Sequence, residues 1–469
     1  MNSNRSAREP GRLRTAAATA AAVVAACTMA VATGCDSSVP KPPASPGPAH
    51  ATARFPGTPA GQQARWLLSA MAHPPIPVSA IKAHFDATFL RQVPAARLDS
   101  VFAQVQSLRL DTITKSTPGI LAFVVTANGT SRLTVSMATD ARGLISGLLL
   151  RPAGASTTAV PTNWPGVDTM IRSVAPQVRF LVAAVHGSTC RPVDAIGATT
   201  PAPLGSAFKL YVLDALARAV AAGTVRWDQS LTVTSQVKSL PSGVLQNDPD
   251  GTRVSVLQVA TDMISISDNT AANMLIALLG RHAVEAAARA SGMADPALDV
   301  PFLTTRELFV LKLHDWPELA EHYLALGAAG RRALLSGTVD RVPLGTLPTA
   351  GWTGPRDIGS LEWFASPADI CQVFASLARQ PGLAPLAGIL ERNAGGLRLD
   401  PSRWQPVWFK GGSEPGVLSL SYLARTRTGQ AYVASVLAEN PAAPLAQNPA
   451  ILTLTTAVKG ALQLAAGRA

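Results

Sequence analysis

Four Ser-x-x-Lys pairs occur in the sequence, at Ser38/Lys41, Ser79/Lys82, Ser206/Lys209 and Ser235/Lys238. On a helix this spacing puts both side chains on one face, where a neutral lysine could take the serine proton and make a nucleophile. The spacing alone is a weak signal. Only Ser206 follows a turn and opens a long apolar helix, whose first backbone N–H groups could face an attacked carbonyl. Ser206 is therefore the candidate nucleophile and Lys209 the candidate base.

Two further motifs follow along the chain. Ser267-Asp268-Asn269 is the one Ser-Asp-Asn in the sequence, and Lys410-Gly411-Gly412 lies on a segment that predicts a strand. Taken alone, the first is typical of a helix N-cap, because all three residue types accept hydrogen bonds from helix N–H groups. The second alone is typical of a strand end, although two glycines on an edge strand also let a ligand approach the backbone closely.

In this order, Ser-x-x-Lys, Ser-Asp-Asn and Lys-x-Gly form the set typical of class A β-lactamases and penicillin-binding proteins. The sequence around each motif resembles class A enzymes, and the resemblance covers about residues 167–467. The 61 residues from Ser206 to Ser267 suit that family, whereas the 143 from Ser267 to Lys410 exceed its usual spacing.

The resemblance implies a role for each motif residue. Ser206 would attack the carbonyl, Lys209 would be the general base, and Asn269 would orient Lys209 and the substrate. Ser267 would relay a proton to the leaving group, helped by Lys410. The backbone N–H groups of Ser206 and Ser413 would form the oxyanion hole. A substrate carboxylate would bind Lys410 and the Ser413 hydroxyl, beside Gly411 and Gly412.

The sequence departs from the class A pattern in two ways. Gly411 stands where these enzymes have Thr or Ser, so one hydroxyl is missing, and Ser413 could replace it. No Glu-x-x-Leu-Asn supplies a carboxylate to activate the deacylating water, and the nearest acids, Asp340, Asp357 and Glu362, are expected to be structural. An acyl-enzyme should therefore turn over slowly.

The chain also resembles a narrower group, the two-domain β-lactamase-like serine hydrolases of actinobacteria, including the clavam-cluster protein. The similar segments are 301–309, 362–367 and 409–413. The resemblance implies a small first domain of steroid-isomerase or cystatin-like fold, and weak esterase or β-lactamase activity at most.

Periodicity predicts two domains of mixed α/β (α+β) class. Helices at 62–71, 80–89 and 98–105 precede strands at 108–116, 119–127, 132–139 and 144–151, which predicts a small α+β domain over 57–153. Its His73, His84 and Asp86 are expected to be surface or capping residues. A linker over 154–166 then leads to a β-lactamase/transpeptidase-like domain over 167–469, a mixed sheet covered by helices.

The start of the chain predicts export. Four arginines, an apolar run over 16–33 and the sequence Val31-Ala-Thr-Gly-Cys35 are typical of a signal peptide with a lipobox, over 1–35, with Cys35 as the lipidation site. A cleaved signal without lipid and an uncleaved anchor are the alternatives. The Pro/Ser-rich stretch 36–56 reads as a tether. We expect the protein on the outer face of the cell membrane.

Two cysteines, Cys190 and Cys371, lie in the predicted hydrolase domain, and a disulfide or two buried thiols are both open. The formal net charge is +11, but no Lys/Arg-rich run follows the leader, so we expect a diffuse basic surface and no nucleic-acid binding. No Cys/His spacing indicates a metal, and no cofactor is expected.

These observations predict a monomeric, membrane-anchored serine hydrolase that acts by acyl transfer on an ester or amide, with a β-lactam, ester or cell-wall peptide as ligand. A true β-lactamase, a D,D-peptidase and a sensor that binds β-lactams or cell-wall ligands without turnover remain alternatives.

Overall fold

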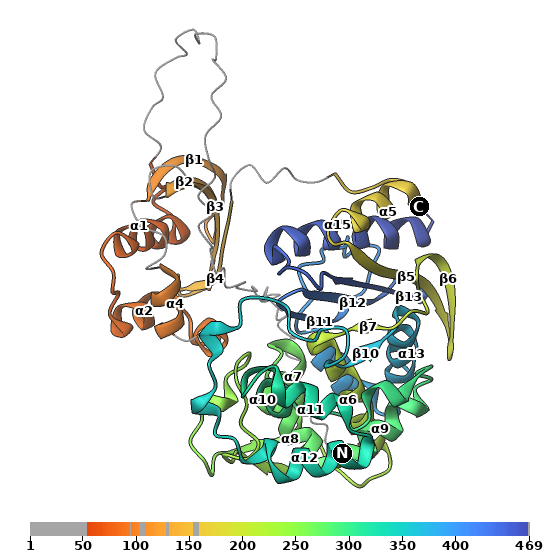
Figure 1. Ribbon diagram of the computed structural model, residues 1–469. Coiled ribbons are helices and arrows are strands. Elements are labelled where there is room, and N and C mark those ends of the chain that lie inside the picture. The colour runs from red at the N-terminus through yellow and green to blue at the C-terminus, as the bar shows by residue number, and fades with distance from the viewer. Residues whose placement is uncertain (1–53, 94, 103–107, 128–130, 153–158, 468–469) are drawn as a thin grey trace, which may run out of the picture.

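The structure, a computed structural model, describes residues 54–93, 95–102, 108–127, 131–152 and 159–467 (Figure 1). The predicted signal peptide, Cys35 and most of the tether lie outside the described residues. Among the described helices, none combines the length and hydropathy that crossing a membrane requires.

The first unit is a layer of helices against a four-stranded antiparallel meander. Its elements are α1 (Pro59–Met71), α2 (Val78–His84), α3 (Ala87–Gln92), α4 (Ala95–Phe102), β1 (Arg109–Ser116), β2 (Ile120–Ala127), β3 (Ser131–Thr139) and β4 (Ile145–Pro152). Alternate residues of β2, namely Leu121, Phe123 and Val125, are buried against the helices, as the two-residue period of a strand dictates. This unit has a hydrophobic core of its own.

The helix expected over 80–89 is two helices. The chain leaves helical geometry at Phe85, which forms a β-bridge with Ile145, and Asp86 then caps α3 by accepting a hydrogen bond from the Phe89 N–H at 2.6 Å. The capping role expected for Asp86 is confirmed. His84 stacks on Trp66 with ring centroids 3.8 Å apart.

The second unit is built on a five-stranded sheet of order β11-β12-β13-β5-β6, in which every pairing is antiparallel. The mixed sheet expected from the sequence is therefore wrong, because β5 and β6 form a hairpin and β5 runs antiparallel to β13. The strands are β5 (Gln177–His186), β6 (Thr189–Ile196), β11 (Trp408–Glu414), β12 (Val417–Arg425) and β13 (Ala431–Glu439). Helices α5 (Trp164–Arg172) and α15 (Gln447–Ala465) cover one face, and the helical region that includes α13 (Pro367–Leu377) covers the other (Figure 1). Phe180 and Val182 face the first layer, and Leu181 and Ala183 the second.

The helical region contains α6 (Lys209–Ala221), α7 (Val256–Ser265), α8 (Asn269–Leu279), α9 (Arg281–Ala290), α10 (Thr305–Leu313), α11 (Glu318–Ala325), α12 (Ala328–Gly337) and α14 (Leu383–Leu390). Its 3-10 turns are η1 (Gly205–Phe208), η2 (Leu245–Asn247), η3 (Pro296–Asp299), η4 (Val339–Arg341), η5 (Leu344–Thr346) and η6 (Thr349–Gly351). Two short strand pairs join β7 (Ala202–Pro203) to β10 (Phe364–Ala365), and β8 (Ser230–Thr232) to β9 (Arg253–Ser255).

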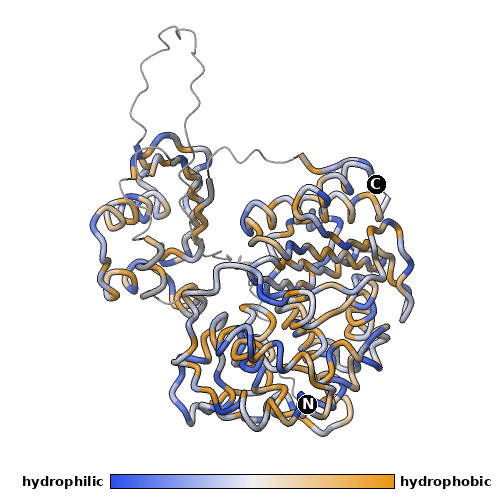
Figure 2. Tube along the Cα trace, in the orientation of Figure 1, coloured by the Kyte–Doolittle hydropathy of each residue, from blue (hydrophilic) through white to orange (hydrophobic). Residues whose placement is uncertain are grey.

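Helix α6 is the central element of this region. Every residue from Lys209 to Ala217 is buried, because the helix is apolar around most of its circumference and is enclosed by other elements. Figure 2 shows the apolar stretches running through this interior and through the sheet. The first turn of α6 is thereby held rigidly.

Several helices and turns lie between Ser267 and Lys410. Helices α11 and α12 and the turns η4 to η6 all lie between α10 and β10. The two motifs nevertheless lie together in space, as the contacts described below show.

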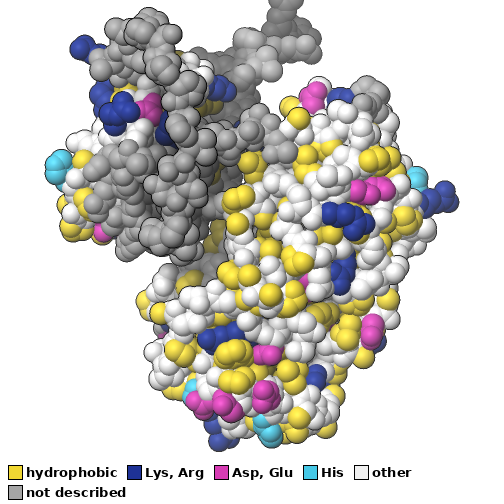
Figure 3. All heavy atoms as spheres, turned by 45° about the horizontal axis from the view of Figure 1, so that its top comes forward, with side chains coloured by type: hydrophobic (Ala, Val, Ile, Leu, Met, Phe, Trp, Pro, Cys, Tyr) yellow, Lys and Arg dark blue, Asp and Glu magenta, His cyan; other side chains and the backbone are white. Residues whose placement is uncertain are grey.

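A disulfide joins Cys190 on β6 to Cys371 on α13, with the Cα atoms 6.3 Å apart. It fastens the edge strand to a helix that packs on the sheet. On the face shown in Figure 3, Lys and Arg side chains are scattered among neutral and apolar ones.

Candidate active site

Ser206 lies in the turn η1, and α6 begins at Lys209, so the candidate nucleophile precedes the α-helix by one tight turn. Lys209 is fully buried, and its Nζ lies 3.2 Å from Ser206 Oγ. In the described part of the chain no other Ser-x-x-Lys pair forms this contact. Lys238 pairs with Asp250 at 2.8 Å, and Ser235 instead contacts its neighbour Gln236.

Lys209 is surrounded by oxygen atoms. Its Nζ donates to the Ser267 carbonyl at 2.6 Å and to Asn269 Oδ1 at 2.7 Å, and lies 3.2 Å from Ser267 Oγ. Burial, and then the nearby charge of Lys410, hold the pKa of Lys209 well below its usual value. A neutral amine would use its two N–H groups on the two shortest contacts, which leaves its lone pair for a serine hydroxyl.

Ser-Asp-Asn serves as both a helix cap and a set of site residues. Asp268 caps α8: its Oδ1 accepts from Ala271 N at 2.8 Å, and its Oδ2 accepts from Val244 N at 2.6 Å and Leu245 N at 2.9 Å. Ser267 and Asn269, on either side, contact Lys209 instead. Ser267 has a positive φ of 58°, a conformation uncommon outside glycine and often found at functional sites.

Lys410 approaches Ser267 from the sheet. It lies on β11, a strand as the sequence predicts and one that forms an edge of the sheet, and its Nζ donates to Ser267 Oγ at 2.9 Å and to the Gly411 carbonyl at 2.6 Å. Burial lowers the pKa of Lys410 to about 7. The Ser267 hydroxyl therefore lies between two lysine amines, in a position to pass a proton.

Two glycines allow η1, the turn that contains Ser206 (called the nucleophile turn below), to pack directly against β11. A Cβ added to Gly412 would lie 2.3 Å from Ser206 N, and one added to Gly205 would lie 2.8 Å from Ser413 N. Gly205 also has a positive φ of 48°. No side chain fits at either contact, and the backbone N–H groups of Ser206 and Ser413 consequently come from directly abutting segments.

The missing hydroxyl at Gly411 has a packing explanation. A Cβ there would lie 2.8 Å from the ring of Phe409 and 3.0 Å from the Ser419 carbonyl. The same ring packs against Gly395, where a Cβ would lie 2.4 Å away. Phe409 thus fills the space that a side chain at position 411 would need. Ser413, by contrast, is exposed and able to contact a ligand.

No carboxylate among the described residues forms a hydrogen bond with Ser206 or Lys209. Asp357 accepts from Trp316 Nε1 at 2.7 Å, and Glu362 accepts from the Gly205 N–H at 3.2 Å. Asp340 neighbours Arg281, Arg306 and Glu307. The three acids singled out from the sequence are thus engaged elsewhere.

Several contributors to the site carry no motif. Ser242 donates from Oγ to the Ser267 carbonyl at 2.7 Å, and the Leu240 carbonyl accepts from Asn269 Nδ2 at 3.1 Å. Their segment is a polar loop in sequence, with no signal that it packs on Ser-Asp-Asn. The described residues include no group of three His, Cys, Asp or Glu side chains that could hold a metal ion.

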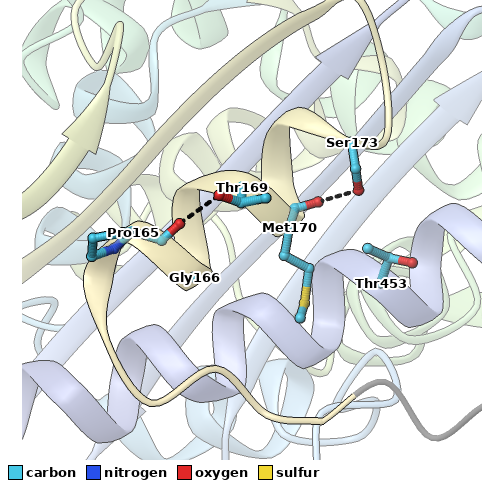
Figure 4. A pocket seen from close by; sticks show the side chains of 6 residues that line it. All are labelled: Pro165, Gly166, Thr169, Met170, Ser173 and Thr453. Carbon is cyan, nitrogen blue, oxygen red and sulfur yellow. Dashed lines mark hydrogen bonds between the residues drawn. The ribbon is translucent and has the colours of Figure 1, made fainter.

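A shallow hollow lies between α5 and α15, on the face of the sheet opposite the helical region that contains Lys209 (Figure 4). The hydroxyls of Thr169 on α5 and of Ser173, the C-cap of α5, already donate to backbone carbonyls of α5 at 2.7 Å. It contains no titratable side chain and is separate from the candidate active site.

Residues 176–335 match the model of the β-lactamase enzyme family, and residues 55–145 match that of the ORF 12 gene product N-terminal region. The expected relationship to class A β-lactamases and penicillin-binding proteins is confirmed, as is a mixed α/β architecture with a β-lactamase-like domain. No curated protein sequence is detectably similar to the chain.

Several solved structures resemble the second unit. A β-lactamase from Sphaerobacter thermophilus is 19% identical, with a TM-score of 0.46, covering 65% of this chain and 98% of its own. A variant of PBP-A in an acyl-enzyme complex with penicillin G is 18% identical, with a TM-score of 0.43, covering 65% and 99%. An ancestral class A β-lactamase is 18% identical, with a TM-score of 0.45, covering 64% and 98%.

Proposed function

We propose, from the premise that the second unit belongs to the class A β-lactamase and penicillin-binding-protein superfamily, that this protein is an exported serine hydrolase acting through a covalent acyl-Ser206 intermediate. The contact that carries the proposal is Lys209 Nζ to Ser206 Oγ, 3.2 Å apart in a site that buries the lysine completely. A neutral amine at this distance makes the hydroxyl nucleophilic.

Acylation proceeds in two steps at the carbonyl carbon, the addition of Ser206 and then the loss of the leaving group. Ser206 Oγ forms a bond to that carbon while its proton moves to Lys209 Nζ, and the carbonyl electron pair moves to the oxygen. The backbone N–H groups of Ser206 and Ser413 stabilise the resulting oxyanion. The oxyanion's electron pair then re-forms the C=O bond as the C–N or C–O bond breaks. The Ser267 hydroxyl gives its proton to the leaving atom and takes one from Lys209 or Lys410.

Deacylation, the hydrolysis of the acyl-enzyme, is the slow step of the proposed reaction. A water must lose a proton as it attacks the acyl carbon, and class A enzymes use a carboxylate for this purpose. Asp268, the acid whose charge acts on Lys209, already accepts three backbone hydrogen bonds. Weak esterase or β-lactamase turnover follows, and the same deficit supports the second candidate, a ligand sensor that acylates and persists.

Export rests on two separate observations. The first 35 residues have the pattern of a signal peptide ending in a lipobox cysteine. In addition, the Cys190–Cys371 disulfide is a bond that persists in oxidising compartments outside the cytoplasm. Lipid-modified Cys35 would hold the protein on the outer membrane face, and mature wild type should then carry a lipid mass on an N-terminal Cys35 that C35A lacks. A mature wild-type chain without that lipid mass would contradict the lipid anchor.

Intact mass spectrometry tests the function. The full chain, S206A and the control S235A, which alters the other Ser-x-x-Lys serine of this unit, are incubated with a penicillin, a cephalosporin and a fluorophosphonate. An adduct on wild type and S235A that is absent from S206A supports the nucleophile. A lasting penicillin adduct indicates a sensor, and a transient one indicates a hydrolase. Release of D-Ala from acyl-D-Ala-D-Ala peptides would instead indicate a D,D-peptidase. Absence of every adduct rejects the proposal.

A further inference from the structure

A buried lysine and two buried glutamates lie beside the nucleophile turn and have no part in the reaction steps above. The Lys312 side chain, near the end of α10, is 0% exposed, and those of Glu362 and Glu414 are 1% and 6% exposed. Lys312 Nζ lies 2.5 Å from Glu414 Oε1 and 3.5 Å from Glu362 Oε1. The three groups form one charged cluster, Lys312–Glu362–Glu414.

One end of this cluster is bonded to the nucleophile turn. Glu362 Oε2 accepts from Gly205 N at 3.2 Å and from Trp363 N at 3.1 Å. Gly205 directly precedes Ser206. The Leu204 N–H also donates to the Trp363 carbonyl at 2.9 Å, beside the β7–β10 pairing. The position of the turn therefore depends on where Glu362 is held.

The other end of the cluster, Glu414, is part of β11, the strand that carries Ser413. Glu414 directly follows Ser413 on β11. Lys312 contacts Glu414 directly and is linked to Gly205 through Glu362. Gly205 precedes Ser206 and Glu414 follows Ser413, and Ser206 and Ser413 supply the two oxyanion donors. The turn at Gly205 and the strand at Gly412 are packed so closely that neither position has room for a Cβ. A displacement of either segment therefore changes the distance between the N–H groups of Ser206 and Ser413.

The cluster's charges keep its members together. Two carboxyl groups share one cation in an interior that excludes water, where an unpaired charge is costly. Burial raises the pKa of Glu414 well above its usual value, with Lys312 opposing this and Glu362 adding to it. Loss of the lysine would leave two acids facing each other with no cation between them.

We infer that Lys312, Glu362 and Glu414 are positioning residues that set the geometry of the oxyanion hole. This role rests on the proposed function, because it concerns acylation of Ser206. It differs from a general contribution to folding in one measurable respect. The limiting acylation rate should fall while initial ligand binding, which needs no oxyanion, should stay the same.

The experiment compares E362A with E362Q in the full chain. Stopped-flow acylation by a chromogenic cephalosporin gives the binding constant and the limiting rate separately. For E362A we expect a limiting rate about 100-fold lower, the scale of a displaced donor, with binding changed less than about threefold. E362Q keeps an oxygen that can accept from Gly205 N, so its limiting rate should be at least about tenfold higher than that of E362A.

E285A is the matched control. Glu285 is a buried glutamate of α9 that likewise accepts a backbone hydrogen bond, from Phe302 N at 3.0 Å, and pairs with Arg332 at 2.8 Å. It contacts no residue of the candidate active site, so E285A should lose stability but keep the acylation rate.

Three results would overturn the inference. These are an unchanged limiting rate in folded E362A, an equal loss of rate in E285A, and equal rates in E362A and E362Q. Should E362A not fold, K312M decides: it keeps a similar buried volume but removes the cation that contacts both Glu362 and Glu414, and an unchanged rate rejects the role. A wild type that no acylating probe modifies rejects the proposed function itself, and this role with it.

Discussion

Ser267 Oγ accepts a hydrogen bond from Lys410 Nζ at 2.9 Å, although the two residues are 143 positions apart. The same oxygen lies 3.2 Å from Lys209 Nζ, so one hydroxyl links the two lysines of the site. Both lysines are buried, and neither has a carboxylate partner within hydrogen-bonding distance among the described residues. This arrangement favours neutral amines and proton transfer.

Lys209→Met should abolish most of the acylation while preserving the fold. The general base is expected to contribute about 10²- to 10⁴-fold, and methionine fills a similar volume in a buried position. Acylation rates with a fluorophosphonate, together with the midpoint of thermal unfolding, measure the two effects. K238M is the control, because Lys238 has the same Ser-x-x-Lys spacing but pairs with the half-exposed Asp250. Wild-type rates in K209M would contradict the role of the base.

Binding of carboxylate-bearing ligands should weaken as the pH rises through about 7. The pKa of Lys410 lies at about 7 because the amine is buried, so the amine is protonated below that pH and neutral above it. A positive charge attracts a carboxylate, so affinity is lost on the alkaline side. The dissociation constant of a penicillin for S206A, measured by calorimetry from pH 5.5 to 8.5 (a range of about 1.5 units around that pKa), reports this directly.

A neutral ester ligand provides the comparison for this titration. Its affinity should show no step near pH 7, since no ligand charge responds to Lys410. In S206A/K410M the step should disappear for the penicillin as well. A penicillin affinity that stays constant across the range would show that Lys410 does not bind the carboxylate.

Local sequence predicted the parts of the site that depend on local geometry. The Ser206–Lys209 contact follows from helical spacing, and Asp268 caps α8 as its residue type predicts. The convergence of the three motifs came from a family resemblance, because no local rule joins residues 61 or 143 positions apart.

Long-range polar contacts without a motif could not be predicted. Lys312 reaches Glu362 and Glu414 across 50 and 102 positions, and nothing in the local sequence around it indicates these partners. The Cys190–Cys371 pairing spans 181 positions and depends on how β6 meets α13. In both cases the partners are chosen by the tertiary fold, so the sequence left the outcome open.

Gly412→Ala should impair both acylation and stability. The new Cβ would lie 2.2 Å from the Leu204 carbonyl oxygen and 2.3 Å from Ser206 N, so the turn and β11 must separate. We expect a destabilisation of about 1–3 kcal/mol from overpacking. The misplaced oxyanion donors should lower the acylation rate by about 100-fold. Urea unfolding and acylation kinetics check the two effects.

Gly337→Ala is the corresponding control. Gly337 ends α12, and an added Cβ meets nothing within 4 Å. Alanine favours a helix over glycine by about 1 kcal/mol at most, so this variant should be neutral or slightly stabilised and fully reactive. An equally reactive G412A would indicate that the turn and the strand separate without disturbing the site.

Removing the disulfide should destabilise the second unit without altering the chemistry of the site. The bond closes a long loop of the unfolded chain, for which the chain-entropy model gives about 5 kcal/mol and measured losses are about 2–5 kcal/mol. Neither cysteine contacts Ser206, Lys209 or Ser267. The double variant C190A/C371A should therefore unfold at lower urea concentration and yet be acylated at the wild-type rate. Addition of a thiol reductant should shift the wild-type transition toward that of the variant and leave the variant's own transition unchanged. If the reductant shifted both transitions equally, it would be acting elsewhere, and the stabilisation could not be assigned to the Cys190–Cys371 bond.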